Sequence, residues 1–218
     1  EIKEPISQGL AHESYVSGVA RTDDFLVTSS FDQRLVWWNI ETGKPVRTIQ
    51  NAHQRFVRDV QASPDGKWIS FTSARDVKNN LYLLQVIGGE AEKITDVKSA
   101  VGNYSWNNNG EMIAFTMIDA AESKEEKDKK AKNDWYYMDE EVKQNRLFVL
   151  WLGKKDTAGK YIQKKITTEN YNINAFNWSP DGKSIAYSHG KSPEVNDNVY
   201  SDISLVDIES GTIKSIVA

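Results

Sequence analysis

The chain has 218 residues, of which 39% are hydrophobic, with 7 Trp and 9 Tyr, and a formal net charge of −4. This composition is typical of a folded protein with a sizeable core, and the acidic balance argues against a nucleic-acid partner. The lack of cysteine excludes disulfides, thiol catalysis and Cys-type zinc sites, and no apolar run approaches the roughly 18–20 residues that span a bilayer. We therefore expect a soluble protein without a membrane span, and the compartment stays open between cytoplasm and periplasm.

A five-residue turn motif recurs along the chain. Ser-Pro-Asp-Gly-Lys occurs at 63–67 and again at 179–183, and a degenerate copy, Asn-Asn-Asn-Gly-Glu, lies at 107–111. Proline presets φ, Asp bonds back to the backbone and Gly accepts a positive φ, so each copy predicts a tight turn between the apolar runs that flank it. A hairpin that recurs along a chain predicts a repeat architecture.

The apolar runs between the turns predict four units of four strands each. The units lie at about 9–50, 51–96, 97–167 and 168–218, and residues 1–8 predict an extra outer strand. The expected strands are 15–20, 25–30, 34–40 and 46–50; 57–62, 68–73, 81–86 and 91–95; 102–106, 112–118, 146–152 and 161–167; and 173–178, 184–188, 203–208 and 212–217. This pattern predicts an all-β fold, a β-propeller with four-stranded antiparallel blades in a single domain or part of one.

The closure of this propeller has three possible forms. Four blades are few for a closed ring, so the chain is either part of a larger propeller or is completed by a second copy in a homodimer. Both forms are favoured over a self-contained four-bladed ring.

A charged insertion at 119–145 interrupts the third unit. Ten of the thirteen residues at 122–134 are charged and form no apolar face, which favours a solvated excursion or a frayed helix. The run that follows, Asp134 to Glu141, combines Trp135, Tyr136 and Tyr137 with carboxylates, so it is a candidate for docking onto a partner.

The first unit resembles a WD repeat, and the resemblance extends over residues 1–62. Ala11-His12 stands where such repeats have Gly-His, Ser30-Phe31-Asp32 matches their Ser-x-Asp, and Trp38-Asn39 matches their Trp-Asp. The resemblance implies that His12, Ser30, Asp32 and Trp38 form a buried hydrogen-bond chain whose role is structural.

Residues 63–218 resemble instead the propeller of the prolyl-oligopeptidase family, close to acylaminoacyl-peptidase, and TolB-like propellers. The resemblance is carried by Ser-Pro-Asp-Gly-Lys-Trp-Ile-Ser-Phe from Ser63, by Asn-Leu-Tyr-Leu-Leu from Asn80, by Gly88-Gly89-Glu90 and by Asn145-Arg146-Leu147 after the insertion. In this family the propeller restricts access to an α/β-hydrolase domain that carries the catalytic triad. The two resemblances meet at 63–67, which indicates either a composite chain, recombined or engineered as a chimera, or one natural propeller that diverged toward both families.

Catalytic and cofactor motifs are sparse in the sequence. The nucleophile motif Gly-x-Ser-x-Gly is absent. Ser188-His189-Gly190 is expected at the end of a strand, with His189 in a loop, and His12, His53 and His189 are too few and too scattered for a metal cluster. We therefore expect no catalytic residue, no metal and no cofactor. Glu140 and Glu141 resemble the glutamates with which dipeptidyl peptidases bind a substrate amine, and the alternative is a solvated or domain-docking loop.

Three functions fit these observations. The first is a non-catalytic propeller that gates substrate access in a prolyl-oligopeptidase-like serine peptidase, with an α/β-hydrolase domain as its partner. The second is a WD-repeat or TolB-like scaffold that binds a protein or peptide. The third is an engineered chimeric half-propeller without biological activity.

Overall fold

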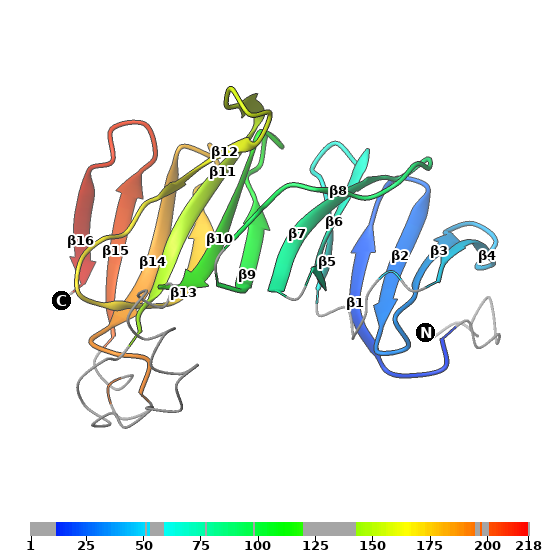
Figure 1. Ribbon diagram of the computed structural model, residues 1–218, viewed down its shortest axis with the longest axis horizontal. Helices are drawn as coiled ribbons and strands as arrows, with labels where there is room; N and C mark the ends of the chain where they lie inside the picture. The colour runs from blue at the N-terminus through cyan, green and yellow to red at the C-terminus, as the bar shows by residue number, and fades with distance from the viewer. Residues whose placement is uncertain are drawn as a thin grey trace, which may run out of the picture. The chain divides into compact units, whose positions relative to one another are not determined.

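The computed structural model describes residues 12–50, 52, 59–76, 78–97, 99–119, 143–194, 197 and 201–217 (Figure 1). The chain divides into two compact units, Glu1–Val97 and Lys98–Ala218, and the described part of each contains two four-stranded antiparallel sheets. In every sheet the strands follow one another in sequence order, so each sheet is an up-and-down meander of three hairpins. This is the architecture of a propeller blade.

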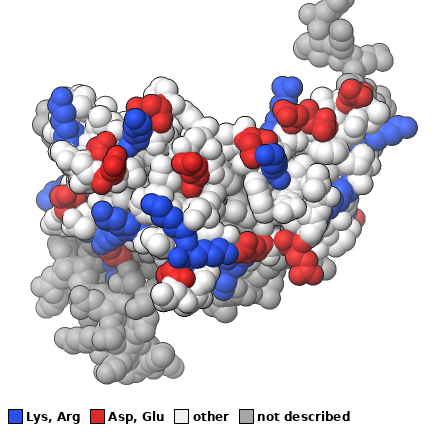
Figure 2. All heavy atoms as spheres, turned by 90° about the horizontal axis from the view of Figure 1, so that it is seen from above, with Lys and Arg blue, Asp and Glu red and all other residues white. Residues whose placement is uncertain are grey.

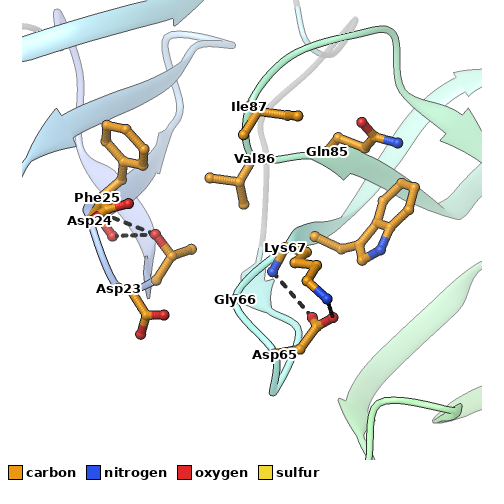
Figure 3. A pocket seen from close by; sticks show the side chains of 11 residues that line it. Asp23, Asp24, Phe25, Asp65, Gly66, Lys67, Gln85, Val86 and Ile87 are labelled. Carbon is orange, nitrogen blue, oxygen red and sulfur yellow. Dashed lines mark hydrogen bonds and ion pairs between the residues drawn. The ribbon is translucent and has the colours of Figure 1, made fainter.

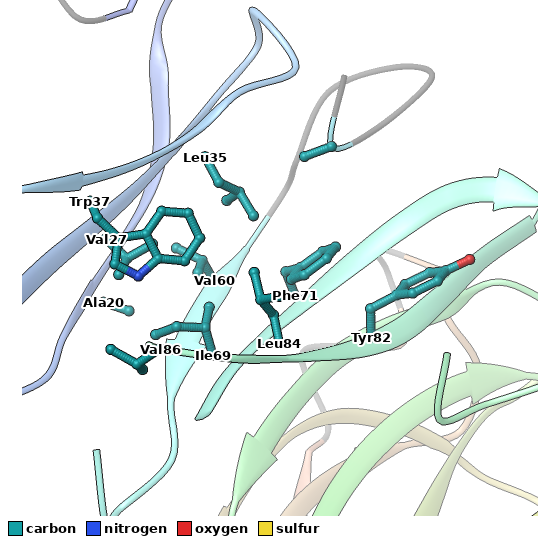
Figure 4. Close-up of a cluster of buried hydrophobic side chains, with 11 residues drawn as sticks. Ala20, Val27, Leu35, Trp37, Val60, Ile69, Phe71, Tyr82, Leu84 and Val86 are labelled. Carbon is teal, nitrogen blue, oxygen red and sulfur yellow. The ribbon is translucent and has the colours of Figure 1, made fainter. Parts of the chain in front are cut away.

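The first unit contains strands β1 to β8. The first sheet consists of β1 (Val16–Arg21), β2 (Phe25–Ser30), β3 (Leu35–Asn39) and β4 (Pro45–Ile49), and the second of β5 (Val60–Ala62), β6 (Trp68–Asp76), β7 (Lys78–Gln85) and β8 (Glu92–Lys93). Side chains from both sheets meet in one apolar cluster (Figure 4). Its largest members are Trp37 on β3, Phe71 on β6 and Tyr82 on β7, and the rings of Phe71 and Tyr82 stack with centroids 5.6 Å apart. Burial of this cluster holds the two sheets face to face.

The second unit contains strands β9 to β16. The third sheet consists of β9 (Val101–Trp106), β10 (Met112–Ile118), β11 (Asn145–Lys155) and β12 (Tyr161–Lys165), and the fourth of β13 (Asn172–Trp178), β14 (Ser184–Gly190), β15 (Asp202–Asp207) and β16 (Ile213–Val217). Its cluster joins Leu147 and Val149 of β11 to Ile173, Ile185 and Val206 of the fourth sheet. The two sheets of this unit are therefore also held together by an apolar interface.

The three turn motifs share one hydrogen-bond pattern. In two of them a serine hydroxyl donates to the aspartate two positions later, at 2.6 Å from Ser63 to Asp65 and at 2.6 Å from Ser179 to Asp181, and accepts the N–H that opens the next strand. In the degenerate copy Asn107 Oδ1 accepts the equivalent N–H, that of Met112, at 2.9 Å. The glycines have φ of 68°, 76° and 68°, which is the reason that the fourth position needs glycine.

The expected fold class is confirmed, because the described chain is nearly all β and forms four antiparallel four-stranded sheets. Most strands begin and end within one to three residues of their expected bounds. The largest differences, three residues at one end of a strand, are in the second and third sheets, at the start of β5, the end of β6, the start of β7 and the end of β11. That the four sheets make up a single domain stays a prediction.

Two expected segments lie outside the described residues. These are the outer strand at 1–8 and most of the insertion at 119–145. The two described ends of the insertion lie side by side, because the N–H of Asp119 donates to the carbonyl of Gln144 at 3.0 Å. The inserted segment is thus carried on the hairpin between β10 and β11.

Candidate functional site

A pocket of about 460 Å³ lies within the first unit, at the end of its two sheets where three hairpin turns meet (Figure 3). These are the turns between β1 and β2, between β5 and β6, and between β7 and β8. The residues that line it are Thr22, Asp23, Asp24, Phe25, Asp65, Gly66, Lys67, Trp68, Gln85, Val86 and Ile87. The volume falls within the usual range of ligand sites.

Backbone hydrogen bonds fix all three turns. Thr22 closes the first turn, because its N–H donates to the carbonyl of Phe25 at 2.8 Å and its hydroxyl accepts the N–H of Phe25 at 3.1 Å. The N–H of Gly66 donates to the carbonyl of Ser63 at 2.9 Å and closes the second turn. The N–H of Val86 donates to the carbonyl of Lys67 at 2.9 Å, which joins the second turn to the third. The pocket walls are therefore formed before any ligand binds.

The pocket combines an apolar wall with an acidic rim. Phe25 and Trp68 are half-buried, Val86 is buried, and Ile87 is 91% exposed in the turn after β7. Asp23 and Asp24 are exposed on the first turn, and neither makes an ion pair with another described residue. Asp65 lies on the second turn and pairs with Lys67 at 3.4 Å. The positive charge of Lys67 is thus balanced locally, while the charges of Asp23 and Asp24 are not.

Asp65 stabilises its own turn by accepting hydrogen bonds from the Ser63 hydroxyl and the N–H of Lys67. The hydrogen bond from the Ser63 hydroxyl holds the pKa of the Asp65 carboxyl below its ordinary value, against a smaller opposing effect of burial, and the N–H and ammonium of Lys67 act in the same direction as Ser63. The carboxylate is therefore ionised at neutral pH.

A second polar site joins His12 to the first sheet. His12 Nδ1 lies 3.0 Å from Asp32 Oδ2, and His12 Nε2 lies 2.7 Å from the hydroxyl of Thr28, which also accepts the indole N–H of Trp38 at 2.8 Å. With Nδ1 donating to the carboxylate, Nε2 of a neutral ring accepts from the Thr28 hydroxyl, so donors and acceptors match along the chain. The side chains of His12 and Asp32 are only 6% and 5% exposed. We refer to His12, Thr28, Asp32 and Trp38 as the histidine relay.

The resemblance to a WD repeat implies that Ser30 belongs to this hydrogen-bond chain, but Ser30 bonds elsewhere. Its hydroxyl accepts the backbone N–H of Asp32 at 3.2 Å, and the hydroxyl between the histidine and the tryptophan is that of Thr28. Burial favours the neutral form of Asp32, but the N–H groups of Glu13 and Arg34 and the contact with His12 outweigh it, and the pKa of Asp32 lies below its ordinary value. The relay connects the segment before β1 to β2 and β3, and its structural role stays a prediction.

A third cluster lies in the fourth sheet. The hydroxyls of Tyr171 and Tyr187 are 2.6 Å apart, the rings of Tyr171 and His189 stack with centroids 4.1 Å apart, and His189 Nε2 lies 2.9 Å from Ser204 Oγ. Burial lowers the pKa of His189, and the charges of Asp202 and Glu169 offset this only in part. Burial and the contact with Tyr187 raise the pKa of Tyr171. His189 lies within β14, so its expected position in a loop was wrong.

The His189–Ser204 pair has part of the geometry of a serine nucleophile and its base. A neutral imidazole faces a hydroxyl at hydrogen-bond distance. However, Ser204 is only 4% exposed, and among the described residues no carboxylate bonds the second nitrogen of the ring. The pair therefore resembles a satisfied buried network more than a catalytic dyad.

An ion-pair network anchors the ends of the insertion. Arg146 Nε donates to Asp119 Oδ2 at 2.7 Å, Lys165 Nζ donates to Asp119 Oδ1 at 2.7 Å, and Arg146 also donates to the carbonyls of Glu169 and Tyr171. Burial raises the pKa of Asp119, but the two cations more than offset it, and the pKa lies below its ordinary value. This network joins β10, β11 and β12 at the point where the insertion leaves the sheet.

Several expected site residues lie outside the described part of the chain. They include His53, Trp135, Tyr136, Tyr137 and the two glutamates, Glu140 and Glu141. Within the described residues, no group of three or more His, Asp or Glu side chains is placed to hold a metal ion, and no helix is long and apolar enough to cross a membrane. On the face in Figure 2, basic and acidic side chains are intermixed.

The pocket was not predicted from the sequence. Two of its three carboxylates, Asp23 and Asp24, lie in a Thr-Asp-Asp turn that has no motif of its own, and Trp68 and Val86 come from two other hairpins. The only local features in the sequence that point to this pocket are the acidic pair Asp23-Asp24 and an apolar residue, Ile87, in the turn at Gly88-Gly89. The third cluster was missed for a similar reason, because Tyr171, His189 and Ser204 come together only through the pairing of β13, β14 and β15.

Comparison with known proteins gives two kinds of relative. The family model "WD domain, G-beta repeat" matches residues 43–76, from the end of the first sheet into β6, so the match crosses the Ser63–Lys67 turn. The nuclear distribution protein PAC1 of Arthroderma otae is 43% identical over 56 residues, which are 26% of this chain and 12% of PAC1. The uncharacterised peptidase YuxL of Bacillus subtilis is 30% identical over 143 residues, which are 60% of this chain and 21% of YuxL. The chain thus spans about a fifth or less of the length of these relatives.

Solved structures show the same fold. A protein assigned as TolB from Agrobacterium tumefaciens superposes with a TM-score of 0.61 at 15% identity, covering 95% of this chain and 63% of the other. The described sheets and this likeness agree on a β-propeller fold, and the similarity to WD repeats, to a TolB-like structure and to a peptidase confirms the resemblances found in the sequence.

Proposed function

We propose that this chain is a non-catalytic propeller segment that restricts the access of peptides to an α/β-hydrolase domain of the prolyl-oligopeptidase type. The observation that carries the proposal is the 30% identity to the peptidase YuxL over 143 residues, in a chain whose described part is built of propeller blades. The absence of Gly-x-Ser-x-Gly from the sequence and the burial of Ser204 support the non-catalytic part.

Two measurements test this proposal. The purified chain is assayed with N-acetylated aminoacyl and free aminoacyl p-nitroanilides, and in parallel it serves as bait for α/β-hydrolase domains. We expect no release of p-nitroaniline above buffer and specific capture of a hydrolase domain. Hydrolysis that co-purifies with the chain and disappears in Ser204→Ala, while His12→Ala keeps it, would assign catalysis to the third cluster and overturn the proposal.

A protein- or peptide-binding scaffold is the second candidate. It is favoured by the match of the WD family model to residues 43–76 and by the similarity to PAC1, because WD repeats generally mediate protein interactions. Cross-linking followed by mass spectrometry separates the two candidates. Recovery of partners without any hydrolase favours the scaffold, and recovery of a hydrolase favours the gate.

A second copy of the chain is a further proposed partner. In the first sheet Val19 on β1 is 59% exposed, and in the fourth sheet Ile203 and Val217 are 42% and 52% exposed. Apolar side chains on a sheet face are usually covered by another layer. Native mass spectrometry tests this proposal: a species at twice 24.7 kDa is expected, and a monomer at all accessible concentrations contradicts it.

A further inference from the structure

The geometry points to the pocket of the first unit as a binding site for an arginine side chain of a peptide partner. This inference rests on the three hairpin turns alone and requires neither a hydrolase domain nor a second copy of the chain. It goes beyond the proposed gate by naming the residues that bind and the chemical class that they recognise.

The acidic rim of the pocket is complementary to a cation. Asp23 and Asp24 are adjacent on an exposed turn and carry charge that no described side chain balances. The second turn lies close to the first, since a Cβ built at Gly66 would be 3.9 Å from Asp23 Oδ2 and 3.8 Å from Asp23 N. The carboxylates of Asp23 and Asp24 and the Asp65–Lys67 pair thus border the same opening (Figure 3). The net charge of these four side chains is −2, from three carboxylates and one ammonium, so the rim complements a cation.

The walls favour a cation with a flat, weakly hydrated head and an apolar stem. Phe25 and Trp68 supply aromatic rings, and Val86 and Ile87 supply aliphatic surface. A guanidinium group stacks on aromatic faces and binds carboxylates with two parallel hydrogen bonds, whereas an ammonium is more strongly hydrated and does neither as well. The methylene groups of an arginine can cover apolar surface while the charged head reaches the rim. Arginine therefore fits this combination better than lysine.

Hydrogen bonds hold the acidic turn of the pocket in place, and an exposed apolar residue lies beside the opening. The turn before Phe25 is closed by Thr22, and the backbone of Asp24 is tied to the sheet because its carbonyl accepts the N–H of Ile40 at 3.1 Å. Ile87 projects 91% exposed from the turn that ends in Gly88-Gly89, where φ is 146° and 98°. An exposed isoleucine at the mouth of the pocket offers apolar contact area to residues that flank the bound arginine.

The test uses the chain and short peptides blocked at both ends, so that the side chain is the only charge. Ac-Gly-Ala-Arg-Ala-Gly-NH₂ is titrated into ¹⁵N-labelled protein, with the citrulline peptide as the neutral match and the lysine peptide as the second cation. We expect saturable shifts of the Trp68 indole N–H and of the amides of Phe25 and Val86 with arginine, weaker shifts with lysine and none with citrulline.

The paired variants assign the binding to the rim. Asp23→Asn with Asp24→Asn removes two exposed charges whose side chains bond no other described residue. We expect the affinity for the arginine peptide to fall about five- to tenfold, as two exposed ion pairs predict. Glu194→Gln with Glu209→Gln removes the same net charge from exposed sites of the second unit and should leave the affinity unchanged. An equal loss in both double variants shows non-specific attraction and overturns the inference, as do shifts that map away from the pocket or that are equal for arginine and citrulline.

Discussion

Thr28 is the residue on which the histidine relay depends, and replacing it with valine tests the relay directly. Valine has nearly the same shape but lacks the hydroxyl, so Thr28→Val removes the contacts to His12 Nε2 at 2.7 Å and to Trp38 Nε1 at 2.8 Å. Each lost hydrogen bond costs about 1 kcal/mol net, and more where a buried partner is left unsatisfied. His12 is nearly buried while Trp38 is half-buried, so water can replace only one partner well, and we expect the free energy of unfolding to fall by about 2–3 kcal/mol.

Urea unfolding followed by tryptophan fluorescence measures this loss. We expect the midpoint to fall at a constant slope m, since the exposed surface of the unfolded chain is unchanged. Thr28→Ser keeps the hydroxyl and should lose at most about 1 kcal/mol, the value of one methyl group. In a double-mutant cycle with Trp38→Phe, a coupling of about 1 kcal/mol is expected between the two positions. If Thr28→Val is as stable as Thr28→Ser, or if the coupling is zero, the hydroxyl does not bridge the two rings and the reasoning is refuted.

Three further predictions concern the second unit, each measured by denaturant or thermal unfolding. A Cβ added at Gly102 would lie 2.7 Å from Thr116 Oγ1, so Gly102→Ala should destabilise the chain by about 1–3 kcal/mol. The control Gly153→Ala, where a Cβ would have no atom within 4 Å, should be neutral. Equal effects of the two variants would show that the close approach at Gly102 is relieved without cost. Arg146→Met leaves the partly exposed Asp119 with Lys165 only and removes the donors to two carbonyls, so we expect the free energy of unfolding to fall by about 2–4 kcal/mol. The control Lys164→Met, on the exposed side of β12, should lower it by less than about 0.5 kcal/mol. Similar values for both variants would contradict a structural role of the network. Burial lowers the pKa of His189 in the folded chain, so the folded chain binds a proton at this ring more weakly than the unfolded chain does. The free energy of unfolding should therefore fall as the pH drops below about 6.5, the pKa of the unfolded residue, and His189→Gln should remove this loss between pH 7 and pH 5. An unchanged dependence on pH in the variant would show that other groups cause the loss.

The features that the sequence predicts well are those determined by neighbouring residues. The turns at Ser63–Lys67 and Ser179–Lys183 form from their own side chains, and the strands on both sides begin where the apolar runs begin. The choice between Ser30 and Thr28 could not be made locally, because residues two apart on β2 point to the same face of the sheet and both carry a hydroxyl. The approach of His12 to that face decides which hydroxyl enters the relay.

Other features depend on pairing that no local pattern specifies. His189 belongs to β14 because Asn172 pairs with Gly190 and Ile173 with His189, which extends the hairpin past the expected end at Ser188. The pocket needs three hairpins at one end of two sheets, and its volume depends on how these sheets pack. A sequence can show that Asp23 and Asp24 are acidic, but it cannot show that Trp68 lines the same pocket.

The repeated turns also have a consequence for the chemical lifetime of the chain. Aspartyl-glycine and asparaginyl-glycine bonds are the usual sites of succinimide formation, in which the glycine nitrogen attacks the preceding side chain and isoaspartate results. In this chain the nitrogens of Gly66, Gly110 and Gly182 each donate to a carbonyl three residues earlier, at 2.9, 3.1 and 2.9 Å, and the side chains of Asp65, Asn109 and Asp181 are held by hydrogen bonds of their own. The same bonds that shape the hairpins therefore protect three labile peptide links from ageing, and isoaspartate at these positions would mark molecules whose turns had opened.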